Sequence, residues 1–417
     1  MAASGLLSRA AGFFRRPPKP PMPVEPSPGE WAELRPRAGV PLVDVVVPVY
    51  AGRVETFRTL QRVLASSGRT PFETVVIDDA TPDPAIAAKL RELAARGLIT
   101  LLVNDRNRGF VATVNRGMAL HPERDVVLLN ADTEVFGDWV DRLMTATAGA
   151  ERIGTATPWS NAATILSYPR GFISNQLLLE IGPAGLDRLA SRLAPTEIDI
   201  PTGVGFCLYI RRPCLAEVGL FDEVNFGRGY GEENDFCRRA ASLGWRHIAA
   251  TNVYVHHYEG RSFGAEKARR VDAAIATLER MYPGYKALIN EFIRRDPLAA
   301  SRSDFDAARV RAAAGKNFLR LGGGRHGSSP GEGEIWLVIS PWWHRGRFRL
   351  ACDRVPETPN LPVLSAAMPV GMVAGILRSL AVERLVVGRR APRRLVRLVA
   401  AAAASAGIEV CDHRRAG

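Results

Sequence analysis

The chain has 417 residues, a formal net charge of +12, and 47% hydrophobic and 24% charged residues. This length allows two or three domains, and the composition is that of a globular protein, which excludes fibrous and predominantly disordered classes. No stretch approaches the roughly 20 uncharged apolar residues that a membrane-spanning helix needs.

Residues 1–40 are rich in proline and predict a segment without regular structure. Proline fixes φ and lacks an amide donor, so a run of prolines does not build a regular core. We expect an extended tail or linker, whose first 14 residues are a candidate short helix for a membrane interface. The prolines are Pro17, Pro18, Pro20, Pro21, Pro23, Pro26, Pro28 and Pro36.

Apolar runs and helical patterns alternate at short spacing from residue 43 to residue 129. Such alternation predicts an α/β domain with a mostly parallel sheet, covered by helices on both faces. The expected strands are residues 43–50, 73–77, 99–103 and 125–129, and the expected helices are residues 54–66, 86–96 and 111–120.

Two of these strands end in acidic residues. Asp78 and Asp79 follow one strand directly, and Asp132 follows another after Asn130 and Ala131. Ligands of such sheets bind beyond the carboxyl ends of the strands. The sequence therefore predicts a polar binding site at this edge.

The pattern is weaker after about residue 153. We expect a strand near residues 205–211, a helix near 233–243 and a closing helix at 271–281. A glycine run at 322–324 predicts a flexible break, and the following strands and helix (335–340, 385–387, 393–406, 408–410) predict part of a second α/β module. The predicted domains are thus a tail (1–40), an α/β domain (41–300) and a basic C-terminal segment of unknown role (301–417).

The positive charge lies mainly in the C-terminal segment. Residues 301–417 hold 19 basic and 9 acidic side chains, whereas residues 1–300 hold 36 and 34. A basic segment can contact acidic lipid headgroups or RNA, but an arginine-rich surface without such a partner explains the charge equally well. Five widely spaced cysteines without a CxxC pair argue against a disulfide framework or structural zinc, and with no recognisable signal peptide they predict a cytoplasmic protein.

Three groups of residues could perform chemistry on a nucleotide-activated substrate. Asp132 could hold a divalent metal, although an Asp after a strand is often only a turn or helix cap. Glu232, Glu233 and Asp235 follow two glycines, which suggests that the backbone lies close to a ligand. The alternative is that these acidic residues only stabilise the first turn of a helix through its dipole. His256 and His257 end a strand-like segment. A histidine there is often structural, but beside a candidate metal carboxylate it could also be a second metal ligand.

Eight motifs together resemble glycosyltransferase family 2, in the order that the family shows and over roughly 260 residues. They are Pro48-Val49-Tyr50, Val76 to Thr81, Asn107 to Gly117, Leu129 to Glu134, Thr202 to Phe206, Gly219 to Glu223, Gly231 to Arg239 and His257 to Gly264. The variants around Asn130 and Glu233 look most like rhamnosyltransferase-like enzymes of bacterial surface polysaccharide synthesis. The segment after residue 320 resembles the beginning of a second glycosyltransferase module.

The resemblance implies an inverting enzyme of the GT-A fold that uses a nucleotide-sugar donor and Mg²⁺ or Mn²⁺. It implies that Glu233 is the catalytic base and that Asp132 and His257 hold the metal, with Asn130 in place of the family's first motif aspartate. The residues implied at the nucleotide are Pro48, Tyr50, Asp78, Asp79, Asn107, Gly109 and Asn130, and those implied at the sugars are Gly203, Glu232 and Asp235.

The implied partners are the donor and a saccharide or lipid-linked acceptor; no nucleic acid is expected, and a peripheral contact with the inner face of the cell membrane stays open. Two other hypotheses remain. A degenerate nucleotide- or sugar-binding scaffold is motivated by Asn130, and a sugar nucleotidyltransferase is opposed by the single glycine, Gly52, after the first strand. Donor sugar, acceptor, linkage and oligomeric state are not predicted.

Overall fold

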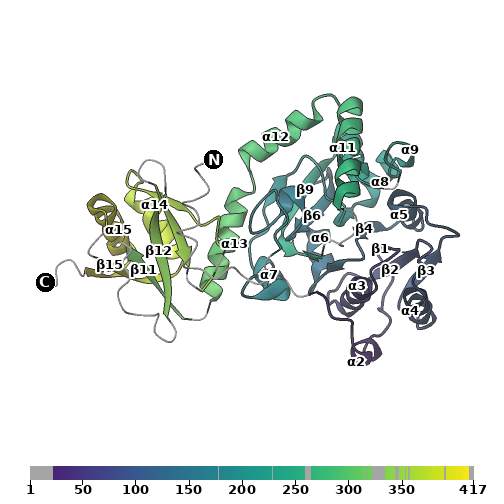
Figure 1. Cartoon of the computed structure of the whole chain (residues 1–417), viewed down its shortest axis with the longest axis horizontal. Coiled ribbons are helices and arrows are strands. Elements are labelled where there is room, and N and C mark those ends of the chain that lie inside the picture. The colour runs from purple at the N-terminus through teal and green to yellow at the C-terminus, as the bar shows by residue number, and fades with distance from the viewer. Residues whose placement is uncertain are drawn as a thin grey trace. The chain divides into compact units, whose positions relative to one another are not determined.

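The computed structural model describes residues 22–176, 178–227, 229–258, 264–313, 315–321, 334–342, 347–352, 354–355, 357–388 and 391–412, with the side chains of 264–268, 334–342 and 347 left aside. The chain forms two compact units (Figure 1). Residues 21–176 and 183–298 form what we call the catalytic unit, and residues 177–182 and 299–417 belong to the C-terminal unit. The expected glycine-rich break at 322–324 lies outside the described residues.

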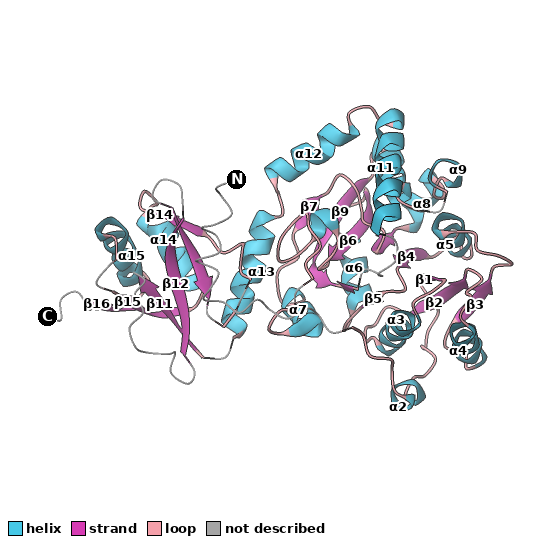
Figure 2. Cartoon of the chain, in the orientation of Figure 1, coloured by secondary structure: helices cyan, strands magenta, loops and turns pink. Residues whose placement is uncertain are grey.

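An eight-stranded mixed sheet is the centre of the catalytic unit (Figure 2). Its order is β3-β2-β1-β4-β8-β6-β9-β7, in which β3, β2, β1 and β4 pair in parallel, as do β6 and β9. The strands are β1 (Val43–Val49), β2 (Phe72–Asp78), β3 (Thr100–Val103), β4 (Asp125–Leu129), β6 (Ile153–Trp159), β7 (Glu197–Asp199), β8 (Cys207–Ile210) and β9 (Arg246–Tyr254). The expected mostly parallel α/β fold is confirmed.

The catalytic unit also contains helices. They are α3 (Arg53–Ala65), α4 (Pro84–Ala95), α5 (Phe110–Met118), α6 (Trp139–Thr147), α7 (Gly182–Ala190), α8 (Arg212–Val218), α9 (Glu223–Phe226), α10 (Glu232–Ser242), α11 (Gly264–Met281) and α12 (Tyr285–Arg295), with a short 3-10 turn, η2, at Thr164–Leu166. One core cluster packs α5, α8 and α10 against alternate residues of β1, β2, β4 and β8, such as Val46, Ile77 and Leu128. β1 is buried almost throughout, as expected for a central parallel strand.

A second, two-stranded sheet joins distant parts of the chain. β5 (Thr133–Glu134) pairs in antiparallel fashion with β10 (His256–His257), with Thr133 opposite His257. The pairing places the segment after β4 beside the segment after β9, which decides the geometry of the site below.

Within the predicted unstructured tail (1–40), residues 28–32 form a helix, and the other described residues up to 40 have no helix or strand; residues 1–21 lie outside the described ranges. Ser27 caps the helix α2 (Pro28–Ala32) in a reciprocal capping box with Glu30. Trp31 is buried against Phe57, and Arg58 binds both Glu30 and the carbonyl of Val24. Burial of an aromatic side chain thus overrides the disorder that the prolines suggest.

The C-terminal unit is a separate α/β structure with its own core. Its sheet has the order β14-β13-β12-β11-β15-β16, with β12, β11, β15 and β16 parallel. The elements are α13 (Ala299–Ala312), β11 (Lys316–Leu321), β12 (Glu334–Trp342), β13 (Arg347–Cys352), β14 (Val363–Ser365), α14 (Val370–Ser379), β15 (Val382–Val387), α15 (Arg393–Ser405) and β16 (Glu409–Asp412). None of the described helices in either unit is long and apolar enough to cross a membrane.

Candidate active site

The carboxyl ends of β1 and β2 meet at one edge of the sheet. Val49 lies opposite Asp78, and the carbonyl of Val49 accepts a hydrogen bond from the amide of Asp79 at 2.8 Å. The Asp78 carboxylate accepts from the amide of Thr81 at 2.7 Å. Tyr50, at the end of β1, is 46% exposed. Asp78 and Tyr50 therefore lie where a bound nucleotide is expected.

The carboxylate of Asp79, a predicted nucleotide contact, binds a loop of the chain itself. One of its carboxylate oxygens accepts from Asn104 at 2.8 Å and from the amide of Arg108 at 2.7 Å, and the other accepts from the amide of Gly109 at 3.0 Å. The carboxylate is buried and holds the loop of Asn107 and Gly109 at the start of α5. The Asp79 carboxylate therefore shapes this loop, and the predicted nucleotide contacts of Asp78 and Asp79 stay predictions.

Asp132 and His257 are brought together by the small sheet. The carbonyl of Asp132 accepts from the amide of Tyr258 at 2.9 Å, and the Oδ1 atom of Asp132 lies 3.3 Å from Nε2 of His257. Adjacent ligand atoms around an octahedral Mg²⁺ are separated by roughly 3 Å, given metal–oxygen distances of about 2.1 Å. The pair predicted to ligate a metal thus has a spacing that fits one.

The ring of His257 is fixed by its surroundings. Its Nδ1 lies 3.0 Å from the carbonyl oxygen of Ala162, which accepts only, so Nδ1 carries the proton and donates. The side chain of Asn161 binds the backbone of His257 on both sides, donating to its carbonyl and accepting from its amide, each at 2.8 Å. Nε2, the other ring nitrogen, therefore faces Asp132, and contacts of this second-shell kind orient histidine ligands in metal sites.

The acidic group predicted at residues 232–235 forms the first turn of α10. Gly231 caps the helix with φ 95°, and an added Cβ would lie 2.8 Å from the Phe226 ring. Burial raises the pKa of Glu233, although backbone amides including that of Gly205 favour its ionised form. Burial and the neighbouring Glu233 raise the pKa of Glu232 well above its usual value. A carboxylate with a raised pKa is suited to accept a proton near neutral pH.

Asp235 does not reach the crevice. It is fully buried, and its carboxylate binds Nε of Arg239 at 2.8 Å and the hydroxyl of Tyr282 at 2.5 Å. These contacts tie α10 to the end of α11. The structure thus gives no support to the prediction that Asp235 contacts a sugar, and we assign it to positioning the helix.

The loop from Thr202 to Phe206 lies between the Glu233 carboxylate and the two predicted metal ligands, Asp132 and His257. Gly203 has no room for a side chain, since an added Cβ would lie 2.5 Å from Leu208, and Gly205 lies against the Glu233 carboxylate. Phe206 stacks on the His257 ring at 5.4 Å between centroids, and its carbonyl accepts from the amide of Asn130 at 2.9 Å. Glu233, His257 and Asp132 therefore belong to one continuous site in the catalytic unit.

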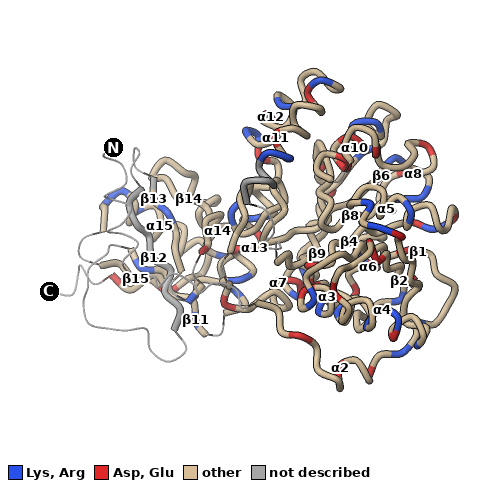
Figure 3. The backbone as a smooth tube through the Cα atoms, turned by 45° about the vertical axis from the view of Figure 1, so that its right-hand side comes forward, with Lys and Arg blue, Asp and Glu red and all other residues tan. Residues whose placement is uncertain are grey.

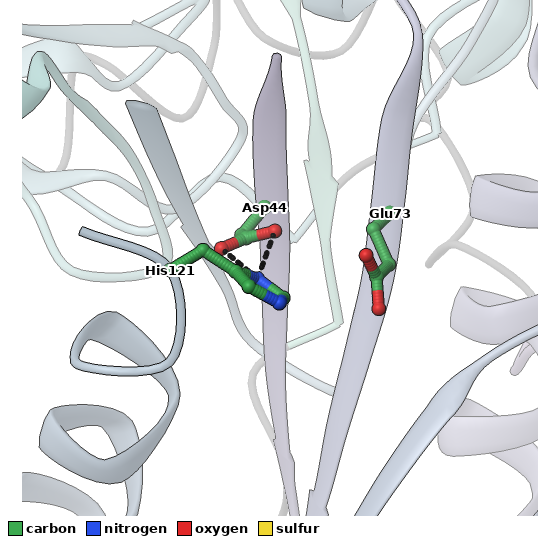
Figure 4. A group of neighbouring side chains, drawn as sticks. All are labelled: Asp44, Glu73 and His121. Carbon is green, nitrogen blue, oxygen red and sulfur yellow. Dashed lines mark hydrogen bonds and ion pairs between the residues drawn. The ribbon is translucent and has the colours of Figure 1, made fainter. Parts of the chain in front are cut away.

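A second group of the kind that can hold a metal ion lies at the opposite end of the strands. Asp44, Glu73 and His121 offer ligand atoms within 4.8 Å of one another (Figure 4). Nη1 of Arg124 lies 3.0 Å from Asp44, 2.5 Å from Glu73 and 3.0 Å from Nδ1 of His121. The guanidinium of Arg124 already pairs with both carboxylates, so we interpret the group as a partly buried ion-pair cluster at the start of β1 and β2.

Residues 44–173 match the model of glycosyl transferase family 2. The chain thus carries a glycosyltransferase family 2 domain. This glycosyltransferase is 26% identical over 253 residues to the N-acetylglucosaminyl-diphospho-decaprenol L-rhamnosyltransferases of two Mycobacterium tuberculosis strains, CDC 1551 and H37Rv. The match covers 55% of this chain and 81% of each relative.

The family 2 glycosyltransferase is also similar to two solved structures. One is GalNAc-T7 with UDP, GalNAc and Mn²⁺, with 16% identity, a TM-score of 0.46, and coverage of 71% of this chain and 68% of that chain. The other is the mannosyltransferase PcManGT from Pyrobaculum calidifontis with GDP-Man and Mn²⁺, with 19% identity, a TM-score of 0.44, and coverage of 71% and 80%. The scaffold and nucleotidyltransferase hypotheses are not favoured.

Two parts of the site were missed from the sequence. Asn161 and Ala162, which fix the metal-side histidine, lie in the weakly patterned region after β6, and their only signal is a polar residue directly after a strand. The connecting role of Phe206 was also missed, although the neighbouring Gly203 and Gly205 indicated a close approach of the backbone.

Proposed function

We propose that the enzyme transfers a hexosyl or deoxyhexosyl group from a nucleoside-diphosphate sugar to a hydroxyl of a lipid-linked saccharide, with inversion. The observation that carries the proposal is the pairing of Asp132 with His257 beside Glu233. The relatives act on an acceptor carried on decaprenyl diphosphate, by their name. We place this chain in the same kind of process, the synthesis of a cell-envelope polysaccharide at the cytoplasmic face of the membrane, with a peripheral contact.

Each residue has a defined task in this mechanism. Glu233 accepts the proton of the acceptor hydroxyl while the hydroxyl oxygen attacks the anomeric carbon. The bond between the anomeric carbon and the diphosphate oxygen breaks, and its electron pair leaves with the diphosphate. Asp132 and His257 would hold a divalent cation, which neutralises the leaving diphosphate. Asp78, Tyr50 and the loop held by Asp79 would contact the nucleoside.

Calorimetric titration of the full chain with UDP, GDP and dTDP, with and without Mn²⁺, tests the donor side. We expect metal-dependent binding of one nucleotide, with a Kd on the order of micromolar. Asp132→Ala should remove the dependence on metal, whereas Glu123→Gln, an exposed change near the other end of the strands, should leave it unchanged. A folded chain that binds none of the three nucleotides would refute the donor class.

The acceptor side needs a separate experiment. The full chain, Mn²⁺ and the nucleotide sugar selected by calorimetry are incubated with N-acetylglucosaminyl diphosphate on a short prenol, and the product is analysed by mass spectrometry. Addition of one glycosyl residue to the lipid-linked sugar supports the proposal. Hydrolysis of the donor without transfer would leave the donor class standing and overturn the acceptor.

A further inference from the structure

Glu232 is a buried carboxyl group without a countercharge. Its side chain is 4% exposed, and its Oε2 atom has no hydrogen-bond partner among the described residues. No ion pair joins Glu232 or Glu233 to a basic side chain in the part of the chain that the structure describes. Two other buried carboxylates differ in this respect, since Asp187 pairs with Arg142 and Asp235 with Arg239.

The surroundings of the two glutamates do not supply the missing charge. The loop that packs on Glu233, residues 202–206, contains no ionisable side chain. Burial raises the pKa of Cys237 to about 12 and raises the pKa of Tyr285, so both groups near Glu233 are neutral. The positive charge of Arg238 lowers the pKa of Cys237 and of Tyr285, and it is not among the causes of the pKa shifts of Glu232 and Glu233. If both groups were ionised, the buried Glu232 would be an anion beside the partly buried anion of Glu233, and the backbone amides near Glu233 would compensate only part of this charge, which is costly.

A single shared proton removes this cost. We propose that Glu232 keeps a proton at neutral pH and donates it in a hydrogen bond to Glu233, so that Glu232 is the positioning residue of the base. This inference rests on the proposed function, in which Glu233 is that base. The pair then holds one negative charge before reaction, takes the proton of the acceptor hydroxyl on Glu233, and releases one proton to water after the product leaves. A pair of this kind titrates as a unit.

The first test compares the neutral and charged forms of residue 232 by steady-state kinetics. Glu232→Gln keeps a neutral donor of similar shape, so kcat at pH 7 should stay within about threefold of the parent enzyme. Glu232→Ala removes a hydrogen bond to a charged group and should lower kcat by about tenfold or more. Glu233→Gln should lower kcat by about 10²-fold or more.

The pH profile separates positioning from a purely structural role. Ionisation of Glu232 at high pH breaks the hydrogen bond, so kcat of the parent enzyme should fall on the alkaline side and Glu232→Gln should lack that fall. An equal loss of kcat in Glu232→Gln and Glu233→Gln would show that Glu232 acts as an anion. An unchanged alkaline limb in Glu232→Gln would also overturn the proposal.

An infrared measurement tests the proton without any transfer reaction. The spectrum of the parent chain at pH 7, after subtraction of the spectrum of Glu232→Gln, should contain the band of a protonated carboxyl group. Subtraction of the spectrum of Glu123→Gln should leave no such band. If this band is absent, the shared proton is wrong whatever the enzyme transfers. If the band is present and no transfer is found with any donor, the proposed function fails and the proton assignment stands.

Discussion

At the scale of single residues, the side chain of Glu233 has one chemical task, and a substitution can remove it without changing the size of the group. Glu233→Gln should abolish transfer, because an amide cannot accept the acceptor proton, while nucleotide binding stays within about threefold. Single-turnover kinetics and calorimetry on the same preparation measure the two quantities. Near-normal turnover in Glu233→Gln would require another base in this site.

Residue identity alone predicted part of the site. An aspartate after a strand and paired histidines at a strand end made Asp132 and one of His256 and His257 candidate metal ligands, and the resemblance to family 2 selected His257. The same reasoning did not distinguish Asp79 from Asp78, since the two residues are adjacent at the end of β2. The difference is three hydrogen bonds from a loop about 25 to 30 residues later, which no local pattern reveals.

At the scale of helices, the N-terminus of α10 depends on Gly231, and Gly284 at the start of α12 is a matched control. Both cap a helix with nearly the same backbone angles, φ 95° and ψ −11° against φ 91° and ψ 5°. An added Cβ at Gly231 meets Phe226 at 2.8 Å and Ala274 at 3.2 Å, whereas one at Gly284 meets nothing within 4 Å.

The unfolding free energies of the two alanine variants should therefore differ only by the steric cost of the added Cβ. Gly284→Ala should cost about 1 kcal/mol of unfolding free energy from the backbone angle, and Gly231→Ala should cost clearly more. Only Gly231→Ala should also lower kcat, because Glu232 and Glu233 follow it directly. Denaturant unfolding and steady-state kinetics measure these effects, and equal losses in both variants would refute the steric argument.

At the same scale, His247 connects β9 with β6 and α10 and makes stability depend on pH. It is 3% exposed, its Nδ1 contacts the hydroxyl of Thr155 at 2.8 Å, and its Nε2 contacts the carbonyl of Cys237 at 2.9 Å. Burial lowers its pKa from 6.5 to about 4. Between these values the unfolded chain binds a proton that the folded chain does not, so stability falls as the pH falls through this window.

The contribution of His247 can be isolated by difference. It amounts to at most about 3 kcal/mol, since one pKa unit corresponds to about 1.4 kcal/mol. His247→Gln lacks this titration, so the parent enzyme should lose its advantage over the variant as the pH falls from 6.5 to 4. Chemical unfolding at several pH values measures the gap, and a constant gap would show that His247 is not buried in its neutral form.

Sequence periodicity predicted some elements closely and missed others, including the long helices α12 and α13 and the first part of α11. The boundaries of β4 were predicted without error, and those of α3, α5 and α10 within two residues, because each has a clear apolar period. The two-residue strands β5 and β10 have no period, and their pairing spans more than 120 residues. The helix α2 was overlooked although Ser27 and Glu30 have the spacing of a capping box, because the prolines were given more weight.

At the scale of the whole molecule, the chain contains two units, and segment 177–182, which the catalytic unit's sequence encloses, belongs to the C-terminal unit. Basic and acidic residues are interspersed along the catalytic unit (Figure 3), in keeping with its nearly balanced charge. Within the C-terminal unit, the fully buried Arg309 binds Glu180 with two hydrogen bonds of 2.8 and 2.7 Å. It also lies 3.4 Å from the buried carboxylate of Asp306.

Arg309→Met should therefore destabilise the C-terminal unit specifically. Loss of one partner of a buried ion pair typically costs about 3–5 kcal/mol, because the remaining charge stays buried. Arg311→Met, an exposed change two residues later in α13, should cost less than about 1 kcal/mol. Metal-dependent nucleotide binding should survive in both variants, since the binding residues belong to the catalytic unit. Loss of nucleotide binding in step with the unfolding of Arg309→Met, followed by calorimetry and hydrogen exchange, would show instead that the two units unfold as one.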